Sequence, residues 1–546
     1  AAHLAGTLED AERAARLFAY LLSSPGEYRA LLEHDPENVK EAASNAIVQQ
    51  LTALSRNGPL LLVIEDAQWI DPTSRELLEA LADRIQSLRI MIVVTFRLDG
   101  PPPLSDNRPA TLLKLTRLRP PDCRAIVETL AERKALPANL LDEIMARADG
   151  VALYLEEITR AVLESETLID CGDHWEAAAG TPARIVPTTL KASLASRLDR
   201  APGTREVAQI ASVIGREFSR DMLAAVSRLT ETAMEDSLSR LVGAGMLQLG
   251  GIPPHASYRF RHALVQEAAY ESLLHSRLKE LHGRVAEVLE RQFPEAAATE
   301  PALLAHHFEK AGLPEKAIEQ YLKAGELALA RSAMSEAITV LQSALGLLPA
   351  LDDEEARRLW ELRLQVSLGS AYRATRAPSA AETGQAWDRA RALCRDEADA
   401  PYLLRALFGQ FLYRQGIADL ARARQLGQDL LAFGQRHAIP SAIAAAYGAI
   451  GRTAFGQGDL GAARTNLEQA LAVDAPADDA TAGDIQRAES RVLDLCYLSW
   501  TLYAQGHSAA ALRCARESIE LARSLVQSYA KVVALGNACY LHHFRR

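Results

Sequence analysis

Leu60-Leu61-Leu62-Val63-Ile64-Glu65-Asp66 is the stretch of this 546-residue chain that decides its fold. Five consecutive apolar residues predict a strand that is buried on both faces of a parallel sheet, because such a strand needs no polar alternation. Ligands bind beyond the carboxyl ends of the strands in sheets of this kind. The paired carboxylates Glu65 and Asp66 therefore lie where a ligand is expected.

Two adjacent carboxylates at that place suit a Mg²⁺ site, since they would repel each other unless a cation or water meets them. In the Walker B arrangement one acid holds Mg²⁺ through water and the other orients the attacking water. On the dipeptide alone, a strand end with two solvated acids is an equally good interpretation. The residues do not say which of Glu65 and Asp66 would play which role.

The elements that follow favour an ATPase core. Residues 71–74, Asp-Pro-Thr-Ser, predict the start of a helix that runs from about residue 75 to 85, and residues 90–96 predict a second strand that ends at Arg97. Strand, helix and strand in this order are expected of a P-loop ATPase, in which Arg97 would sense the γ-phosphate. A surface charge is the plainer interpretation of this arginine.

The phosphate-binding loop of such a core is not found in the sequence. A Gly-x-x-x-x-Gly-Lys-Ser/Thr loop supplies the amides and the lysine that hold phosphates, and no Gly-Lys pair occurs in these 546 residues. The chain also begins at Ala1 without an initiator Met. We therefore expect a fragment that begins after the loop, with ATP, ADP and Mg²⁺ bound tightly only by an intact protein.

Residues 59–74 resemble the extended Walker B segment of bacterial STAND-class AAA-like ATPases with tetratricopeptide (TPR) repeats. More narrowly, they resemble the ATPases that are fused to a class III adenylate/guanylate cyclase domain. Further segments match this family in the same order along the chain: residues 93–97, 149–157, 185–190, 214–218 and 258–270.

The resemblance implies roles for three further residues. Arg97 lies in the family's sensor segment, and Gly150 opens the family motif Gly-x-Pro-Leu-x-x-Glu-Glu, which packs near the adenine. Ala152 stands here in place of the motif's proline. His262 corresponds by position to the histidine that contacts bound ADP, although a capped histidine at a helix start is an equally good interpretation.

The sequence predicts a mainly α-helical chain with several domains. In order, we expect a partial P-loop α/β ATPase core at 1–97, a helical lid at 98–165 with a short strand at 111–115, a linker with a hairpin turn at 166–186, a winged-helix domain at 187–292, and an α-solenoid of TPR-like repeats at 293–546.

The winged-helix prediction depends on helices at 188–198, 204–214 and 231–242, followed by a strand, a turn and a strand. A helix that reads DNA is basic, whereas the third helix carries Glu231, Glu235 and Asp236 against Arg240. We therefore expect no direct nucleic-acid binding. In the resembled family this domain instead packs on the ATPase and helps to set its inactive state.

Small residues recur through the C-terminal half at the offsets of TPR helix pairs, whose period is about 34 residues; they include Gly325, Gly369, Gly409, Gly451 and Gly506. They recur because adjacent helices must approach closely. The concave face of such a solenoid usually binds a protein or peptide. The Gly-x-G-x-x-G match at 456–461 lies in a predicted repeat turn without a preceding strand, so a dinucleotide site is not expected there.

Composition limits the other possibilities. The net charge of −10 and the pI of about 5.8 give no reason to expect binding to nucleic acid or to an anionic membrane. Six cysteines form no C-x-x-C pair, and no apolar run approaches the roughly 20 residues of a membrane helix. We therefore expect a cytoplasmic protein with reduced thiols. His306-His307 and His542-His543 have no companion ligands at metal spacing in the sequence.

Two classes of function remain open. The first is the regulatory part of an ATP-switched signalling protein, in which ATP permits self-association and controls a linked nucleotide cyclase or, in a LuxR-type regulator, a transcriptional output. Its parent would be an ATPase and this fragment inactive. The second is a nucleotide-independent scaffold that acts through its repeats alone. The motifs at 69–72 and 260–264 favour the cyclase-linked switch.

Overall fold

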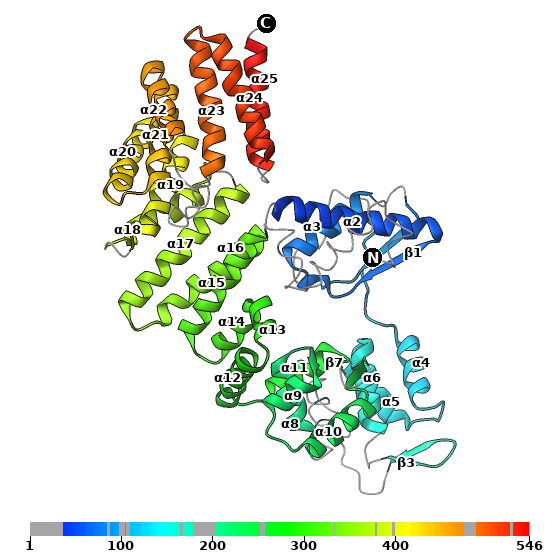
Figure 1. Cartoon of the computed structure of the whole chain (residues 1–546). Coiled ribbons are helices and arrows are strands. Elements are labelled where there is room, and N and C mark those ends of the chain that lie inside the picture. Colours follow the sequence, from blue (N-terminus) through cyan, green and yellow to red (C-terminus); the bar gives the residue numbers. More distant parts are fainter. Residues whose placement is uncertain are drawn as a thin grey trace. The chain divides into compact units, whose positions relative to one another are not determined.

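A computed structural model describes most of the chain: residues 36–84, 88–97, 104, 110–163, 168–177, 194, 198, 203–251, 257–331, 333–376, 379–395, 399–473, 487–524 and 528–544. Helices dominate these residues, and the sheets are small (Figure 1). The mainly α-helical class is therefore confirmed. Two compact units form: the first comprises residues 1–108, 299–305 and 314–546, and the second comprises 109–298 and 306–313.

The described N-terminal part of the first unit is a short α/β segment: α2 (Pro36–Asn57), β1 (Leu60–Ile64), the 3₁₀ turn η2 (Ala67–Trp69), α3 (Pro72–Arg84) and β2 (Ile90–Val94). The predicted first strand is confirmed, and the second ends two residues earlier than expected. The carboxylate of Asp71 accepts a hydrogen bond from the Ser74 amide at 2.8 Å, which satisfies a free donor at the start of α3.

The expectation that β1 is buried on both faces is wrong. Side chains alternate along the strand between half-buried and exposed, and Leu61 and Val63 are 60% and 50% exposed. Met91 on β2 is 64% exposed. Alternation arises because successive side chains of a strand point to opposite faces, and the described residues cover only one face of this sheet.

In the second unit, three helices form the core of the predicted lid: α4 (Pro120–Leu130), α5 (Ala138–Ala148) and α6 (Ala152–Leu163). Their buried side chains, which include Val127, Ile144 and Leu155, pack in one cluster. The strand predicted at 111–115 is wrong, because these residues form no strand and Leu113 and Leu115 are 81% and 94% exposed. An apolar run without a neighbouring strand has nothing to pair with.

A hairpin follows the lid, and it was expected to be part of a linker. Strand β3 (Leu168–Asp170) pairs in antiparallel fashion with β4 (Trp175–Ala177), which confirms the turn at 171–175. The Trp175 amide donates to the carbonyl of Ala135 at 2.9 Å, and Leu168 and Trp175 pack against the lid core. The hairpin is thus anchored to the lid helices.

The next region combines helices with a three-stranded antiparallel sheet, ordered β5-β7-β6. Its elements are α8 (Thr204–Ile214), β5 (Glu217–Ser219), α9 (Arg220–Val226), α10 (Glu231–Gly243), β6 (Leu247–Gly250) and β7 (Ser257–Phe260). The predicted helices at 204–214 and 231–242 are confirmed, the latter one residue longer. The predicted helix at 188–198 and the motif at 185–190 lie outside the described residues, apart from Leu194 and Leu198, which are helical and buried.

Four helices continue the chain: α11 (Ala263–Glu271), α12 (His275–Gln292), α13 (Pro294–Thr299) and α14 (Pro301–Lys310). The first unit resumes with the helix pairs of the solenoid: α15 (Pro314–Ala330) and α16 (Met334–Leu347), α17 (Glu354–Arg376) and α18 (Ala381–Leu393), α19 (Ala400–Gly416) and α20 (Leu420–Arg436), α21 (Pro440–Gly456) and α22 (Leu460–Ala472), α23 (Arg487–Ala504) and α24 (Ser508–Ser524), then α25 (Ser528–Phe544).

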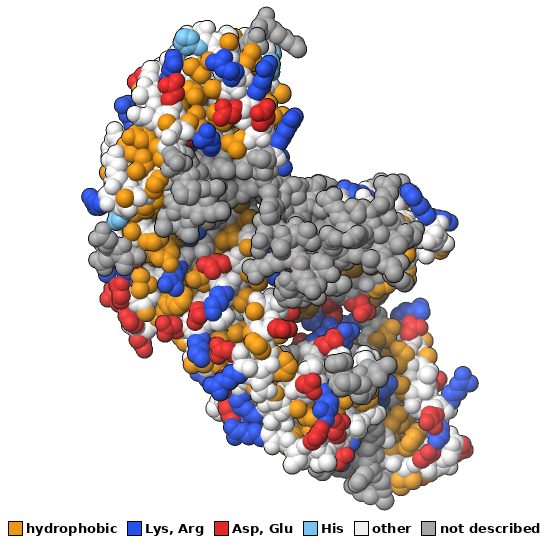
Figure 2. Space-filling view, viewed as in Figure 1, with side chains coloured by type: hydrophobic (Ala, Val, Ile, Leu, Met, Phe, Trp, Pro, Cys, Tyr) orange, Lys and Arg blue, Asp and Glu red, His pale blue; other side chains and the backbone are white. Residues whose placement is uncertain are grey.

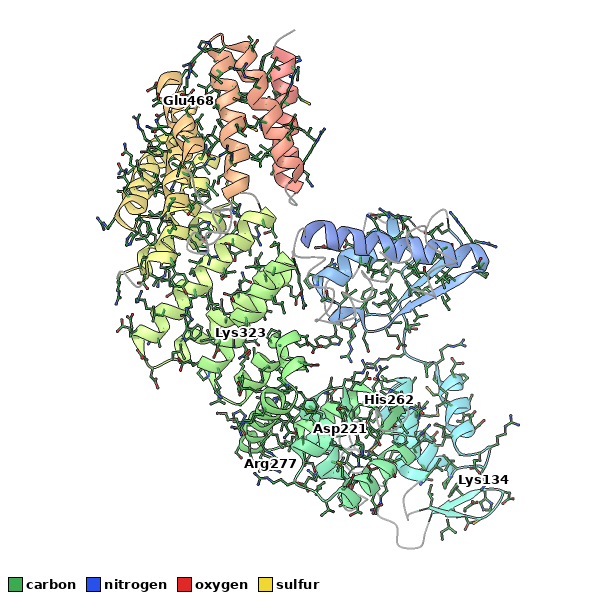
Figure 3. All side chains as sticks on the ribbon, in the orientation of Figure 1. Lys134, Asp221, His262, Arg277, Lys323 and Glu468 are labelled. Carbon is green, nitrogen blue, oxygen red and sulfur yellow. The ribbon has the colours of Figure 1, made fainter. Side chains whose placement is uncertain are left out.

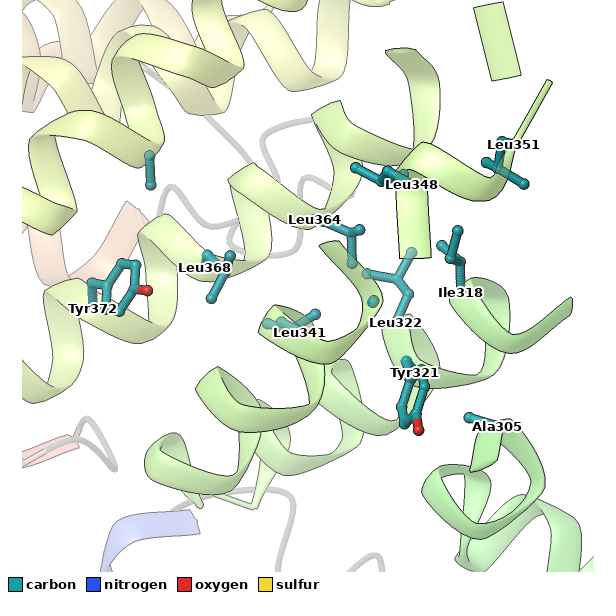
Figure 4. Close-up of a cluster of buried hydrophobic side chains, with 12 residues drawn as sticks. Ala305, Ile318, Tyr321, Leu322, Leu341, Leu348, Leu351, Leu364, Leu368 and Tyr372 are labelled. Atoms are coloured by element: carbon teal, nitrogen blue, oxygen red, sulfur yellow. The ribbon is translucent and has the colours of Figure 1, made fainter. Parts of the chain in front are cut away.

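Successive pairs begin at Pro314, Glu354, Ala400, Pro440 and Arg487, so the repeat is 40 to 47 residues rather than about 34. The repeat is longer because most of these helices contain 17 residues or more. One buried cluster joins α14 to α18 and includes Ile318, Leu341 and Leu364 (Figure 4). The small side chains expected at helix crossings lie there: a Cβ on Gly325 would lie 2.6 Å from the Leu341 side chain.

The surface mixes both signs of charge and exposes apolar side chains on α25. Figure 2 shows Lys and Arg side chains interspersed with Asp and Glu on the visible face, without one dominant sign of charge. On α25, Val532, Tyr540 and Phe544 are 68%, 59% and 63% exposed. Among the helices that are described, none is both long enough and apolar enough to cross a bilayer.

Candidate functional site

The carboxyl ends of β1 and β2 bring Glu65, Asp66 and Arg97 to one edge of the sheet. The two strands are parallel and in register, from Leu60 opposite Ile90 to Ile64 opposite Val94. Because parallel strands end at the same edge, the residues that follow them are neighbours. Glu65 and Arg97 are exposed there, and Asp66 is half-buried.

Thr95 ties this edge together beyond the last strand pair. Its amide donates to the Ile64 carbonyl at 2.9 Å, and its own carbonyl accepts from the Ala67 amide at 2.8 Å. The Thr95 hydroxyl accepts a further bond, 3.1 Å long, from the Asp66 amide. Three bonds from one residue therefore fix the backbone of the acidic pair relative to β2.

Asp66 adopts a left-handed backbone conformation, with φ of 54° and ψ of 40°. Few residues other than glycine adopt it, and Asp and Asn are the commonest of them. The conformation turns the chain from β1 into η2. It places the carboxylate of Asp66 next to Gln68, whose Nε2 donates to Asp66 Oδ1 at 3.2 Å.

Gln68 is the site residue that sequence reasoning missed. Its Oε1 accepts a hydrogen bond from the Arg97 amide at 3.2 Å, while its Nε2 reaches Asp66. One side-chain amide thus connects the end of β1 with the end of β2. The available signal was its position two residues after the acids, but a pattern of residue types alone does not indicate which way a glutamine points.

The edge fits the metal part of a nucleotide site. Carboxylate oxygens are the ligands that Mg²⁺ prefers, commonly with several waters retained. Glu65 is exposed, and Asp66 is half-buried with Gln68 Nε2 donating to its Oδ1. This edge could therefore hold Mg²⁺ through water, while Arg97 supplies a positive charge beside it.

Gly150 and His262 belong to the second unit. Gly150 has φ of +72°, and a Cβ there would lie 2.7 Å from the Leu118 carbonyl oxygen. The Leu118 amide donates to the Gly150 carbonyl at 2.8 Å. The described contacts of Gly150 thus show a structural need for glycine, just before the start of α6.

His262 is the residue that precedes α11. Its backbone is extended, with φ of −131° and ψ of 139°, and its side chain makes no capping hydrogen bond. His262 thus stands at the N-cap position of α11, as the plainer interpretation expects, but its side chain makes no capping bond. Beside it, Arg261 and Arg160 of α6 both approach Gly245, where a Cβ would lie 3.2 and 3.7 Å from their Nη1 atoms. This junction brings α6 close to the region of α8–α11.

Residues 1–94 match the family model of the AAA ATPase domain. An uncharacterized protein of Rhizobium meliloti (strain 1021) is 30% identical over 356 residues, which is 65% of this chain and 34% of that protein. The chain thus spans about a third of the length of this curated relative.

Two solved structures illustrate the similarity, both at low scores. A signal transduction ATPase with numerous domains (STAND) with a tetratricopeptide repeat sensor, from Pyrococcus horikoshii, is 12% identical with a TM-score of 0.32, covering 92% of this chain and 79% of that chain. The apo form of RapI is 16% identical with a TM-score of 0.33, covering 50% and 77%. We draw no argument from similarities at these scores.

Proposed function

We propose that this chain is the regulatory part of an ATP-switched signalling protein. The observation that carries the proposal is the edge where Glu65, Asp66 and Arg97 meet, held by Thr95 and Gln68. This edge coincides with the end of the segment that matches the AAA ATPase domain. It is followed along the chain by a helical lid and a solenoid, which are the parts that a switch needs.

In this proposal Glu65 and Asp66 hold Mg²⁺ through water and orient the attacking water, and Arg97 senses the γ-phosphate. Gln68 connects the phosphate sensor Arg97 to the metal-binding residue Asp66, because its side chain bonds to both Asp66 and the Arg97 amide. A shift of the Arg97 backbone when the γ-phosphate is lost would therefore move Gln68 and, through it, change the hydrogen bond to Asp66. Gly150 lies near the adenine, and His262 contacts ADP in the inactive state.

The region of α8–α11 is proposed as a winged-helix domain that regulates the ATPase. The support is its order of helices and strands and the β5-β7-β6 sheet. Its third helix, α10, is poorly suited to DNA: Arg220 forms ion pairs with Glu231 and Glu235 on that helix. Carboxylates on the outer face of α10 would repel the phosphates of DNA.

The solenoid is proposed to bind a protein or peptide and to transmit the ATPase state to a linked nucleotide cyclase. Stacked helix pairs from α15 to α24 support the first half of this statement. The second half depends on the resemblance of the motifs at 69–72 and 260–264 to the cyclase-linked family. Self-association on activation is part of the same proposal.

The first experiment compares Asp66→Asn with the unchanged full-length protein that the gene encodes. We expect ATP hydrolysis to fall by about 10²-fold or more, with ATP binding retained, because the amide cannot hold the metal or orient water as a carboxylate does. Asp71→Asn is the matched control, because Asp71 caps α3 and asparagine also caps a helix. Unchanged turnover in Asp66→Asn contradicts the assignment, and a full-length protein that neither binds nor hydrolyses ATP supports the scaffold instead.

A second experiment tests His262. In the full-length protein we expect His262→Ala to release bound ADP faster, because the substitution removes the proposed contact of the imidazole with the nucleotide. The rate is measured as loss of labelled ADP after dilution. His275→Ala, which changes an exposed histidine at the start of α12, serves as the control. Unchanged retention in His262→Ala rejects the sensing role.

A further inference from the structure

The outer face of the β3–β4 hairpin gathers three different metal-ligating side chains. The Cys171 amide donates to the His174 carbonyl at 2.9 Å, which leaves Gly172 and Asp173 as the two turn residues. Gly172 has φ of +95°, as the first position of a tight hairpin turn requires. Cys171 and His174 are therefore cross-strand partners and share one face.

The strand register adds Glu176 to the same face. Ile169 pairs with Glu176, and Asp170 pairs with Trp175, so alternate residues divide between the two faces. Trp175 packs on the lid core, and Lys134 lies 5.4 Å from its ring centroid. The face that carries Cys171, His174 and Glu176 is consequently the outward one, on a hairpin that extends from the lid helices (Figure 1; Lys134 is labelled in Figure 3).

The ligand atoms are close enough to share one ion. One atom each of Cys171, His174 and Glu176 lie within 4.8 Å of one another. His174 Nε2 is 3.1 Å from Glu176 Oε1, and its Nδ1 is 2.6 Å from Asp173 Oδ1. A carboxylate on Nδ1 fixes the ring and leaves Nε2 to a metal, which is the usual arrangement of a histidine ligand.

We propose that Cys171, His174 and Glu176 bind a divalent cation of the zinc class, with Asp173 orienting the histidine. A thiolate, an imidazole and a carboxylate together select Zn²⁺ over Mg²⁺ or Ca²⁺, which take oxygen ligands. Three protein ligands leave the fourth tetrahedral position to water or to a group from a partner. This site is separate from the Mg²⁺ edge at Glu65 and Asp66 and does not depend on ATP.

Anchoring of the hairpin gives such an ion a defined place on the second unit. Trp175 bonds to the Ala135 backbone, and Lys134 forms an ion pair with Asp170 at 2.6 Å. The strand pair next to the hairpin turn is thereby held to the α4–α5 connection. An ion at the outer face would add a link between the turn and β4, with an open ligand position facing outward.

The test is a Co²⁺ titration of the reduced 546-residue chain, followed by absorption spectroscopy. We expect saturation at one equivalent, a thiolate-to-cobalt charge-transfer band, and loss of that band when Zn²⁺ is added. Cys171→Ser should remove the band, and His174→Gln and Glu176→Gln should weaken binding. Asp173→Asn should weaken it about 10–100-fold, as removal of an orienting partner does.

Cys539→Ser is the matched control, because Cys539 is another exposed cysteine and lies on α25 in the other unit. We expect its titration to equal that of the unchanged chain. Circular dichroism confirms that each variant is folded. The proposal is overturned if Co²⁺ binds without saturation, if the band persists in Cys171→Ser, or if it disappears in Cys539→Ser.

Discussion

His307 lies at the end of a buried chain of hydrogen-bonded side chains. Its Nδ1 is 2.9 Å from Nδ1 of His282, and Nε2 of His282 is 2.9 Å from the hydroxyl of Tyr270. His282 and His307 are each only 2% exposed, and His307 Nε2 is buried without a partner among the described residues. His306 and Lys310 on α14 also face this cluster.

Acid should destabilise the second unit through this cluster. Burial, with the nearby histidines, lowers the pKa of His307 to about 3, whereas an unfolded histidine titrates near 6.5. Below pH 6.5, His307 is therefore protonated in the unfolded state but stays neutral in the folded state. From pH 7 to 5 this costs the folded state about 2 kcal/mol for His307. We expect His307→Gln to lose that much less stability over this range, measured by urea unfolding at both pH values.

The control for this experiment is His275→Gln, since His275 is exposed at the start of α12. Its loss of stability between pH 7 and 5 should match that of the unchanged protein. If His307→Gln loses as much stability between pH 7 and 5 as the unchanged protein, then His307 is not the group whose lowered pKa causes the loss.

Trp387 shows why particular glycines recur in the solenoid. Its indole lies between Gly369 of α17 and Gly409 of α19, and a Cβ on Gly369 would lie 2.5 Å from Trp387 Cε2. A Cβ on Gly409 would overlap the same ring. The two glycines thus let three successive helices close around one buried aromatic side chain.

We expect Gly409→Ala to destabilise the solenoid by about 1–3 kcal/mol, because the added methyl group must displace Trp387 or separate the helices. Gly346→Ala is the matched control, since a Cβ at Gly346 in α16 meets nothing within 4 Å. At that position alanine, which forms helices better than glycine, should leave the stability of the solenoid unchanged or raise it by up to about 1 kcal/mol. Thermal unfolding of both variants makes the comparison, and equal shifts would contradict this account.

Between elements, the buried pair Arg452–Asp494 joins α21 to α23 at 3.0 Å. The side chains are 2% and 1% exposed, and Arg452 is also 5.5 Å from the ring centroid of Phe411. The Nε and Nη2 atoms of Arg452 are buried without hydrogen-bond partners among the described residues. Such a pair adds little to stability, but one partner left alone is costly.

Asp494→Ala should therefore destabilise the solenoid by about 3–5 kcal/mol, because it leaves a buried guanidinium uncompensated. The double variant Arg452→Met/Asp494→Ala should recover much of that loss, since no charge remains to desolvate. Urea unfolding of both variants measures the difference. A double variant that is less stable than Asp494→Ala would show that the arginine contributes mainly through its packing.

At the scale of the whole molecule, the two compact units should unfold separately. Each contains a buried cysteine: Cys123 in the second unit is 3% exposed, and Cys496 in the first is 1% exposed. Burial raises the pKa of Cys496 to about 11, so its thiol is unreactive while the helix pair is folded.

We expect Cys123 and Cys496 to become reactive toward a thiol label at different urea concentrations, each at the unfolding midpoint of its own unit. Peptide mapping of the labelled chain distinguishes the two sites. Cys539 is exposed and should react without urea, which provides the internal control. A single midpoint for both buried thiols would show that the two units unfold as one.

Much of the local structure was predictable because it depends on residues close together in the sequence. β1 was predicted with the right bounds from its apolar run, and the helix at 204–214 and the hairpin turn at 171–175 were also predicted. The close packing of small residues at helix crossings was also expected. The strand at 111–115 failed because an apolar run says nothing about whether a partner strand exists.

The sequence by itself therefore determined the helical class, the bounds of β1, the acidic pair at its end and the helix crossings marked by glycine. Only the tertiary structure decided that Gln68 connects Asp66 to the Arg97 backbone, that His307 meets His282, and that one face of the hairpin packs on the lid. The physical reason is range: propensity and periodicity act over one or two turns of chain. Which side chains meet across elements depends on register and crossing geometry, which all the elements set together.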